Sequence, residues 1–124
     1  MYLLLRLVDG LSVELGEFKM DQTTFISRLV EEHNLCVQIS KAKNADYSTT
    51  NDAFLNFRGA LQIGVDPAQA ILVRMSDKMA RIGNLLKKKK AAVADESVAD
   101  TLRDLSNYAL ILLLFLEETG KEQS

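Results

Sequence analysis

Apolar residues recur at helical spacing along most of the chain, from about residue 20 to residue 118. The pattern predicts helices over residues 21–43, 52–62, 67–89 and 95–118, joined by short polar links. The first helix has two candidate caps, Asp21 and Thr23. The fold class is therefore all-α, a small helical bundle of about four helices.

The links carry residues that end or start helices. The segment NADYSTTND, residues 44–52, is dense in turn-forming side chains and predicts a loop. In GVDP, Gly64 ends one helix, Asp66 caps the next, and Pro67, the only proline, takes its first position.

Residues 1–19 follow a different pattern and are treated as an N-terminal extension to a helical domain over residues 20–124. Asp9-Gly10 separates two apolar runs, and the second run alternates from Leu11 to Leu15, as in a β-hairpin. The leucines favour helix over strand, so a short hairpin is the most that this segment predicts.

Charge and composition exclude several classes of protein. The formal net charge of −2 does not favour a duplex nucleic acid as partner, and a single cysteine fits a reducing, cytoplasmic location. The apolar run over residues 109–116 is shorter than the roughly 20 residues of a membrane span. Its surplus of leucines favours burial in a homo-oligomer, although burial within one chain explains it equally well.

The last helix carries a row of acids. Glu96, Asp100 and Asp104 are each four residues apart and share one helical face, which Asn107 continues. Carboxylates one turn apart can supply the oxygen ligands that Mg²⁺ prefers. The alternative is structural, because Ser97-x-x-Asp100 also matches a capping box and Asp104 needs only a salt bridge.

Cations on the preceding helix face this row if the last two helices pair antiparallel and turn near Ala92. That arrangement places Arg81 beside Asp104 and Lys78 beside Asn107. Buried ion pairs are seldom retained for stability alone, because desolvation offsets much of the attraction. Phosphate binding by Lys78 and Arg81 is therefore one interpretation, and a network that fixes the register of the helices is the other.

The loop before the second helix offers further polar side chains. A tyrosine and amides in a loop can stack on a nucleobase and bond to it, although the same residues are ordinary turn formers. The loop residues concerned are Lys41, Asn44, Asp46, Tyr47 and Asn51. No histidine cluster, Gly-rich phosphate loop or catalytic triad accompanies them.

Three blocks carry a family resemblance: KNADYS…NDAFLNF, VRMSDKMARIGNLL and DESVADTLRDLSNYALIL. In this order they resemble the first of the nucleotide-modification-associated domain families of phages and bacteria, over residues 41–117. The resemblance implies a phage context, a modified or non-standard nucleotide as partner and, for a phage protein, the host cytoplasm. It also implies that Met20 is the usual start of the domain.

The acid pattern is in turn similar to all-α NTP pyrophosphatases of the MazG and dimeric dUTPase type. Those enzymes hold Mg²⁺ with E-x-x-E and E-x-x-D on two helices and cleave between the α and β phosphates. By this similarity Glu96 and Asp100 stand in for the second pair, but four residues apart instead of three. The first pair has no match, since Asp77 is followed by Lys78 and Arg81.

Three functions follow from these observations. The first is Mg²⁺-dependent hydrolysis of a nucleotide phosphate, with Mg²⁺ on Glu96, Asp100 and Asp104. The second is nucleotide binding without cleavage, as in sequestering a signalling nucleotide, and the missing E-x-x-E favours it. The third is a structural oligomeric bundle. For the first two, the expected nucleotide-binding residues are Lys41, Asp46, Tyr47, Asn51, Lys78, Arg81 and Asn107.

Overall fold

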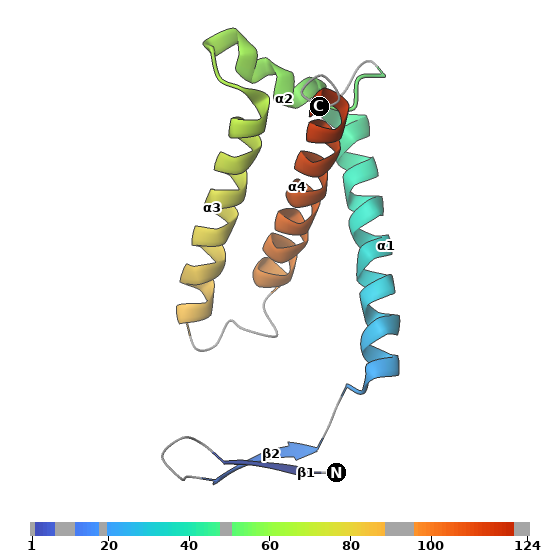
Figure 1. Ribbon diagram of the computed structural model, residues 1–124, viewed down its shortest axis with the longest axis vertical. Helices are drawn as coiled ribbons and strands as arrows, with labels where there is room; N and C mark the ends of the chain where they lie inside the picture. Colours follow the sequence, from blue (N-terminus) through green and yellow to red (C-terminus); the bar gives the residue numbers. More distant parts are fainter. Residues whose placement is uncertain (1, 7–11, 18–19, 48–50, 89–95, 121–124) are drawn as a thin grey trace. The chain divides into compact units, whose positions relative to one another are not determined.

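The computed structural model describes residues 2–6, 12–17, 20–47, 51–88 and 96–120 (Figure 1). The elements are strands β1 (Tyr2–Arg6) and β2 (Ser12–Glu17), helices α1 (Gln22–Tyr47), α2 (Leu55–Arg58), α3 (Pro67–Lys87) and α4 (Glu96–Gly120), and a 3₁₀ helix, η1 (Gly59–Ile63). The chain divides into two compact units, residues 1–34 and 35–124. The predicted all-α bundle of four helices is confirmed.

The first unit contains the two strands and the first half of α1. β1 and β2 pair antiparallel, with Leu5 opposite Val13, as expected for a short hairpin; the turn at Asp9-Gly10 lies outside the described residues. Asp21 caps α1, because its carboxylate accepts a hydrogen bond of 2.7 Å from the backbone N–H of Thr24. Of the two candidate caps, the chain uses Asp21.

The second unit is built on α3 and α4, which lie side by side and run antiparallel (Figure 1). Its core is formed by the buried side chains of Phe57, Ile71 and Phe115. Phe115 meets Phe54 edge to face, with ring centroids 5.4 Å apart. Partly buried residues of α3 and α4 pack around this cluster, namely Met75, Tyr108, Ile111 and Leu112. The core thus joins α2 to both long helices.

A corner at α2 and η1 connects α1 to α3. Arg58 pairs with Asp52 at 2.7 Å and with Glu118 of α4 at 2.8 Å. The hydrogen bonds from Arg58 and from the backbone N–H of Phe54 hold the pKa of Asp52 below its ordinary value. Gly64 then adopts a left-handed φ of 76°, which favours glycine. These contacts fix the corner against the end of α4.

The start of α3 agrees with its sequence signals. The carboxylate of Asp66 accepts a hydrogen bond of 3.0 Å from the backbone N–H of Ala68, and Pro67 begins the helix. The predicted caps of GVDP are therefore confirmed.

Two predicted boundaries are wrong. α1 continues to Tyr47 instead of ending near Lys43, because Ala45 is a strong helix former and Asn44 donates its amide N–H to the carbonyl of Ala53, at 2.8 Å. The expected helix over residues 52–62 is instead a single α-helical turn followed by η1. The change falls at Gly59, a poor helix former.

Several large apolar side chains of α4 are exposed. Leu113 is 60% exposed, and Leu110 and Leu116 are 44% and 48% exposed. The homo-oligomer that such leucines favour stays a prediction. Within the described ranges, none of the helices combines the length and hydrophobicity that crossing a membrane requires.

Candidate functional site

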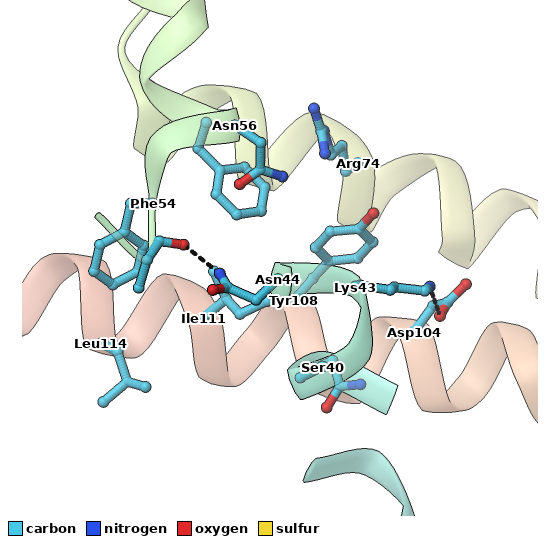
Figure 2. A pocket seen from close by; sticks show the side chains of 13 residues that line it. Ser40, Lys43, Asn44, Phe54, Asn56, Arg74, Asp104, Tyr108, Ile111 and Leu114 are labelled. Atoms are coloured by element: carbon cyan, nitrogen blue, oxygen red, sulfur yellow. Dashed lines mark hydrogen bonds and ion pairs between the residues drawn. The ribbon is translucent and has the colours of Figure 1, made fainter. Parts of the chain in front are cut away.

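The second unit contains a cavity of about 160 Å³ between α1, α2, α3 and α4 (Figure 2). Aromatic rings and aliphatic side chains form much of its wall, with several amides among them. Figure 2 shows Phe54 and Leu114 on one side, and Arg74, Tyr108 and the Lys43–Asp104 pair on the other. The described residues of the wall are Ser40, Lys43, Asn44, Ala53, Phe54, Asn56, Phe57, Arg74, Asp104, Asn107, Tyr108, Ile111 and Leu114.

Hydrogen bonds between elements hold the amide side chains of the wall. Asn44 bonds the end of α1 to the carbonyl of Ala53, just before α2. Asn107 of α4 donates its amide N–H to the carbonyl of Cys36 in α1, at 3.1 Å. Each amide also has an oxygen that accepts hydrogen bonds. The cavity therefore has an apolar interior with a few fixed polar groups, which is typical of small-molecule sites.

Asp104 lies between two lysines from different helices. Lys43 of α1 donates a hydrogen bond of 2.9 Å to Oδ1, and the Nζ atom of Lys78 of α3 lies 3.3 Å from Oδ2. Partial burial raises the pKa of Asp104, but the hydrogen bonds and charges of the two lysines outweigh burial and hold this pKa below its ordinary value. Asp104 is therefore ionised at neutral pH.

A wider, cationic groove of about 880 Å³ adjoins the cavity along α3. Arg74 and Tyr108 line both spaces, so the two share a wall. Arg74 lies over the ring of Phe57, with the guanidinium carbon 4.9 Å from the ring centroid. The remaining groove residues are Asp77, Lys78, Ala80, Arg81, Asn84, Leu85 and Lys88. An aromatic cavity thus opens beside a row of cations.

Residues 43–116 match a protein family described as Nucleotide modification associated domain 1. The chain belongs to this family. The matched domain includes the whole cavity wall except Ser40, and the whole groove. Comparisons with curated proteins and with solved structures gave no match.

Within this nucleotide-modification-associated domain, the predicted pairing of α3 with α4 is wrong by three residues. Lys78, not Arg81, faces Asp104, and Arg81 donates a hydrogen bond of 3.2 Å from Nε to the hydroxyl of Thr101. The prediction assumed a turn centred near Ala92, whereas the register of two helices is set by side-chain packing along both. Ala92 itself lies outside the described residues. Lys78, Asp104 and Asn107 nevertheless come together around the cavity and groove.

The proposed magnesium ligands are not assembled in the described part of the chain. Both oxygens of Asp104 contact ammonium groups, and Asp100, whose side chain is 67% exposed, pairs with Arg103 on its own helix. The side chain of Glu96 lies outside the described residues, and the others contain no cluster of at least three potential metal ligands. Mg²⁺ prefers several oxygen ligands, and the two described carboxylates are paired with cations, so magnesium stays a prediction.

Most of the predicted loop residues lie outside the cavity wall. Lys41, Asp46 and Asn51 are exposed and do not line it, and the side chain of Tyr47 is not among the described ones. Of the five loop residues that the sequence singles out, Asn44 alone is among the described residues of the wall. Sequence reasoning missed Lys43, Asn56, Arg74 and Tyr108 as site residues. Their only available signal was their position inside the three family-like blocks.

Proposed function

We propose that the protein binds a nucleotide, with the base in the aromatic cavity and the phosphate in the groove beside it. One observation carries the proposal: a cavity lined by aromatic rings shares Arg74 and Tyr108 with a cationic groove. A nucleotide has the matching arrangement, a flat ring at one end and an anion at the other. The family description, which refers to nucleotide modification, supports the same class of ligand.

The size and polarity of the cavity support a base as its occupant. An apolar cavity of about 150 Å³ in another protein accepts a benzene ring, and this one has about 160 Å³. Tyr108 offers a ring for stacking. Asn44 and Asn107 offer amide groups for the polar edge of a base.

Binding without cleavage is favoured over hydrolysis. Asp104, the one predicted metal ligand among the described residues of the cavity wall, is paired with Lys43 and Lys78. In a purely structural ion-pair network, most cations of the network would pair with a carboxylate. Arg74 and Arg81 contact no carboxylate among the described residues, which disfavours this alternative. The cytoplasmic location stays a prediction from the sequence, and a nucleotide ligand is consistent with it. The phage origin stays a prediction as well.

Isothermal titration calorimetry with a panel of canonical and modified nucleotides tests the proposal. The experiment is run in EDTA and again with Mg²⁺, and chromatography then establishes whether the ligand is recovered intact. We expect binding in both buffers and an intact ligand. Turnover that depends on Mg²⁺ would instead support hydrolysis, and a panel with no binding nucleotide would refute the proposal.

Tyr108→Leu locates the site, because it removes the stacking ring but keeps an apolar side chain. Base stacking on an aromatic residue is worth about 1–3 kcal/mol, so we expect nucleotide affinity to fall roughly tenfold. Leu113→Ala, on the exposed part of α4 and outside the cavity wall, is the control and should leave affinity unchanged. Equal affinity of Tyr108→Leu and wild type would place the ligand elsewhere.

A further inference from the structure

We infer that the groove on α3 is a polyphosphate subsite, in which Arg74, Lys78 and Arg81 hold a di- or triphosphate chain without a metal ion. The inference rests on the proposed nucleotide-binding function and goes further by naming the ligand as a nucleoside polyphosphate. It assigns the phosphate charge to cationic side chains of α3 instead of to Mg²⁺ on the acids of α4.

The partners of the arginines carry the inference. Arg28, Arg58 and Arg103 each pair with at least one carboxylate. In contrast, Arg74 and Arg81 contact no carboxylate among the described residues: Arg74 stacks on a ring and Arg81 bonds to a hydroxyl. Both line the groove. A guanidinium without an internal anion keeps N–H donors that suit phosphate oxygens.

The spacing of the cations fits an extended anion. Arg74, Lys78 and Arg81 stand at positions i, i+4 and i+7, so they share one face of α3. From the first to the last, the helix rises about 10 Å, more than a single phosphate needs and suited to a chain of them. Lys88 extends the row, and Asp77 is the only acid among the described residues of the groove wall. The groove thus has a strong excess of positive charge.

The shared wall sets the direction of the ligand. Because Arg74 and Tyr108 line both the cavity and the groove, a ligand with its base in the cavity leaves it past these two residues. Its first phosphate then meets Arg74, and later phosphates reach Lys78 and Arg81. Lys78 forms an ion pair with Asp104, which offsets part of its positive charge. Arg81 therefore contributes most to binding the outer phosphates.

Calorimetry in EDTA tests this with the mono-, di- and triphosphate of one nucleoside and with inorganic tripolyphosphate. We expect the triphosphate to bind at least tenfold more tightly than the monophosphate, and its affinity to fall more steeply with salt. Arg81→Gln should abolish this gain and leave the monophosphate within twofold of wild type. Lys87→Gln, with the same charge change on α3 but outside the groove wall, is the matched control and should keep the gain.

Arg81→Lys controls for an effect on folding, because it keeps the positive charge but loses the planar guanidinium group. We expect its preference for the triphosphate over the monophosphate to lie between those of wild type and Arg81→Gln, with an unchanged circular dichroism spectrum. Equal affinity for mono- and triphosphate, or a gain that appears only with Mg²⁺, would overturn the subsite while leaving the base site intact. A third outcome is that tripolyphosphate binds, that Arg81→Gln weakens this binding, and that no nucleoside phosphate binds more tightly than tripolyphosphate. This outcome would support the subsite and refute the base site. No binding by any probe would refute both.

Discussion

Replacing Asp104 by asparagine removes a carboxylate that links α4 to both α1 and α3, and the effect on stability follows from these contacts. Asp104 is 21% exposed, and its partners Lys43 and Lys78 are 48% and 29% exposed. Exposed ion pairs contribute about 0.2–1 kcal/mol each. Because these two are partly buried and share one carboxylate, we expect Asp104→Asn to lower the free energy of unfolding by about 1 kcal/mol near neutral pH.

The same contacts predict how this difference depends on pH. The pKa of Asp104 is lower in the folded chain than in the unfolded chain, where it is about 3.9. Its stabilising contribution is therefore complete above the unfolded pKa and is lost as pH falls through the folded pKa. Wild type and Asp104→Asn should differ at neutral pH and converge in acid, since the protonated side chain no longer pairs with Lys43 or Lys78.

Urea denaturation followed by circular dichroism, at about pH 7 and at a series of lower pH values, measures both quantities. Asp100→Asn is the matched control, because the Asp100 side chain is 67% exposed and, among the described residues, it pairs with Arg103 on the same helix. We expect the control to change the free energy of unfolding by less than about 0.5 kcal/mol. Equal stability of Asp104→Asn and wild type at neutral pH, or a difference that persists in acid, would refute the reasoning.

Three further predictions concern the core, the start of α3 and the cavity. Phe115 is 4% exposed and meets both Phe54 and the Arg58 guanidinium, so Phe115→Ala should lower the free energy of unfolding by about 3–5 kcal/mol, and Phe115→Leu by less. Asp66→Ala removes the cap at Ala68 and should cost about 1 kcal/mol, measured in the same denaturation assay, with Asp66→Asn close to wild type. Pyrimidine nucleotides should bind more tightly than purine nucleotides in calorimetry, because a cavity of about 160 Å³ suits one ring; a purine preference would contradict this.

Local signals in the sequence were sufficient to predict most of the fold. Helical periodicity located the long helices, and the caps at Asp21 and Asp66 act within one turn of their own positions. The errors arose where a distant contact decides the structure. Asn44 reads as a loop former, yet in the folded chain it bonds to Ala53 and lies within α1. A propensity rule cannot anticipate a partner nine residues away across a turn.

The candidate site was harder to predict, because its parts come from four elements. The row of acids on α4 suggested that these side chains act together, but they have different surroundings: Asp104 meets lysines of two helices, while Asp100 pairs within α4. Periodicity assigns residues to a face of their own helix and does not fix which neighbour that face meets. Tyr108 and Arg74 read as unremarkable helix positions until the packing of α3 on α4 brings them together.

The charge around the cavity explains why the overall net charge is a poor guide to the ligand. The chain as a whole is slightly acidic, with a formal net charge of −2. Around the cavity and groove, however, Asp104 is shared by Lys43 and Lys78, so a single carboxylate offsets part of two positive charges. Arg74 and Arg81 add to this excess. Cations this close repel one another, so the local charge favours the anionic ligand that we propose.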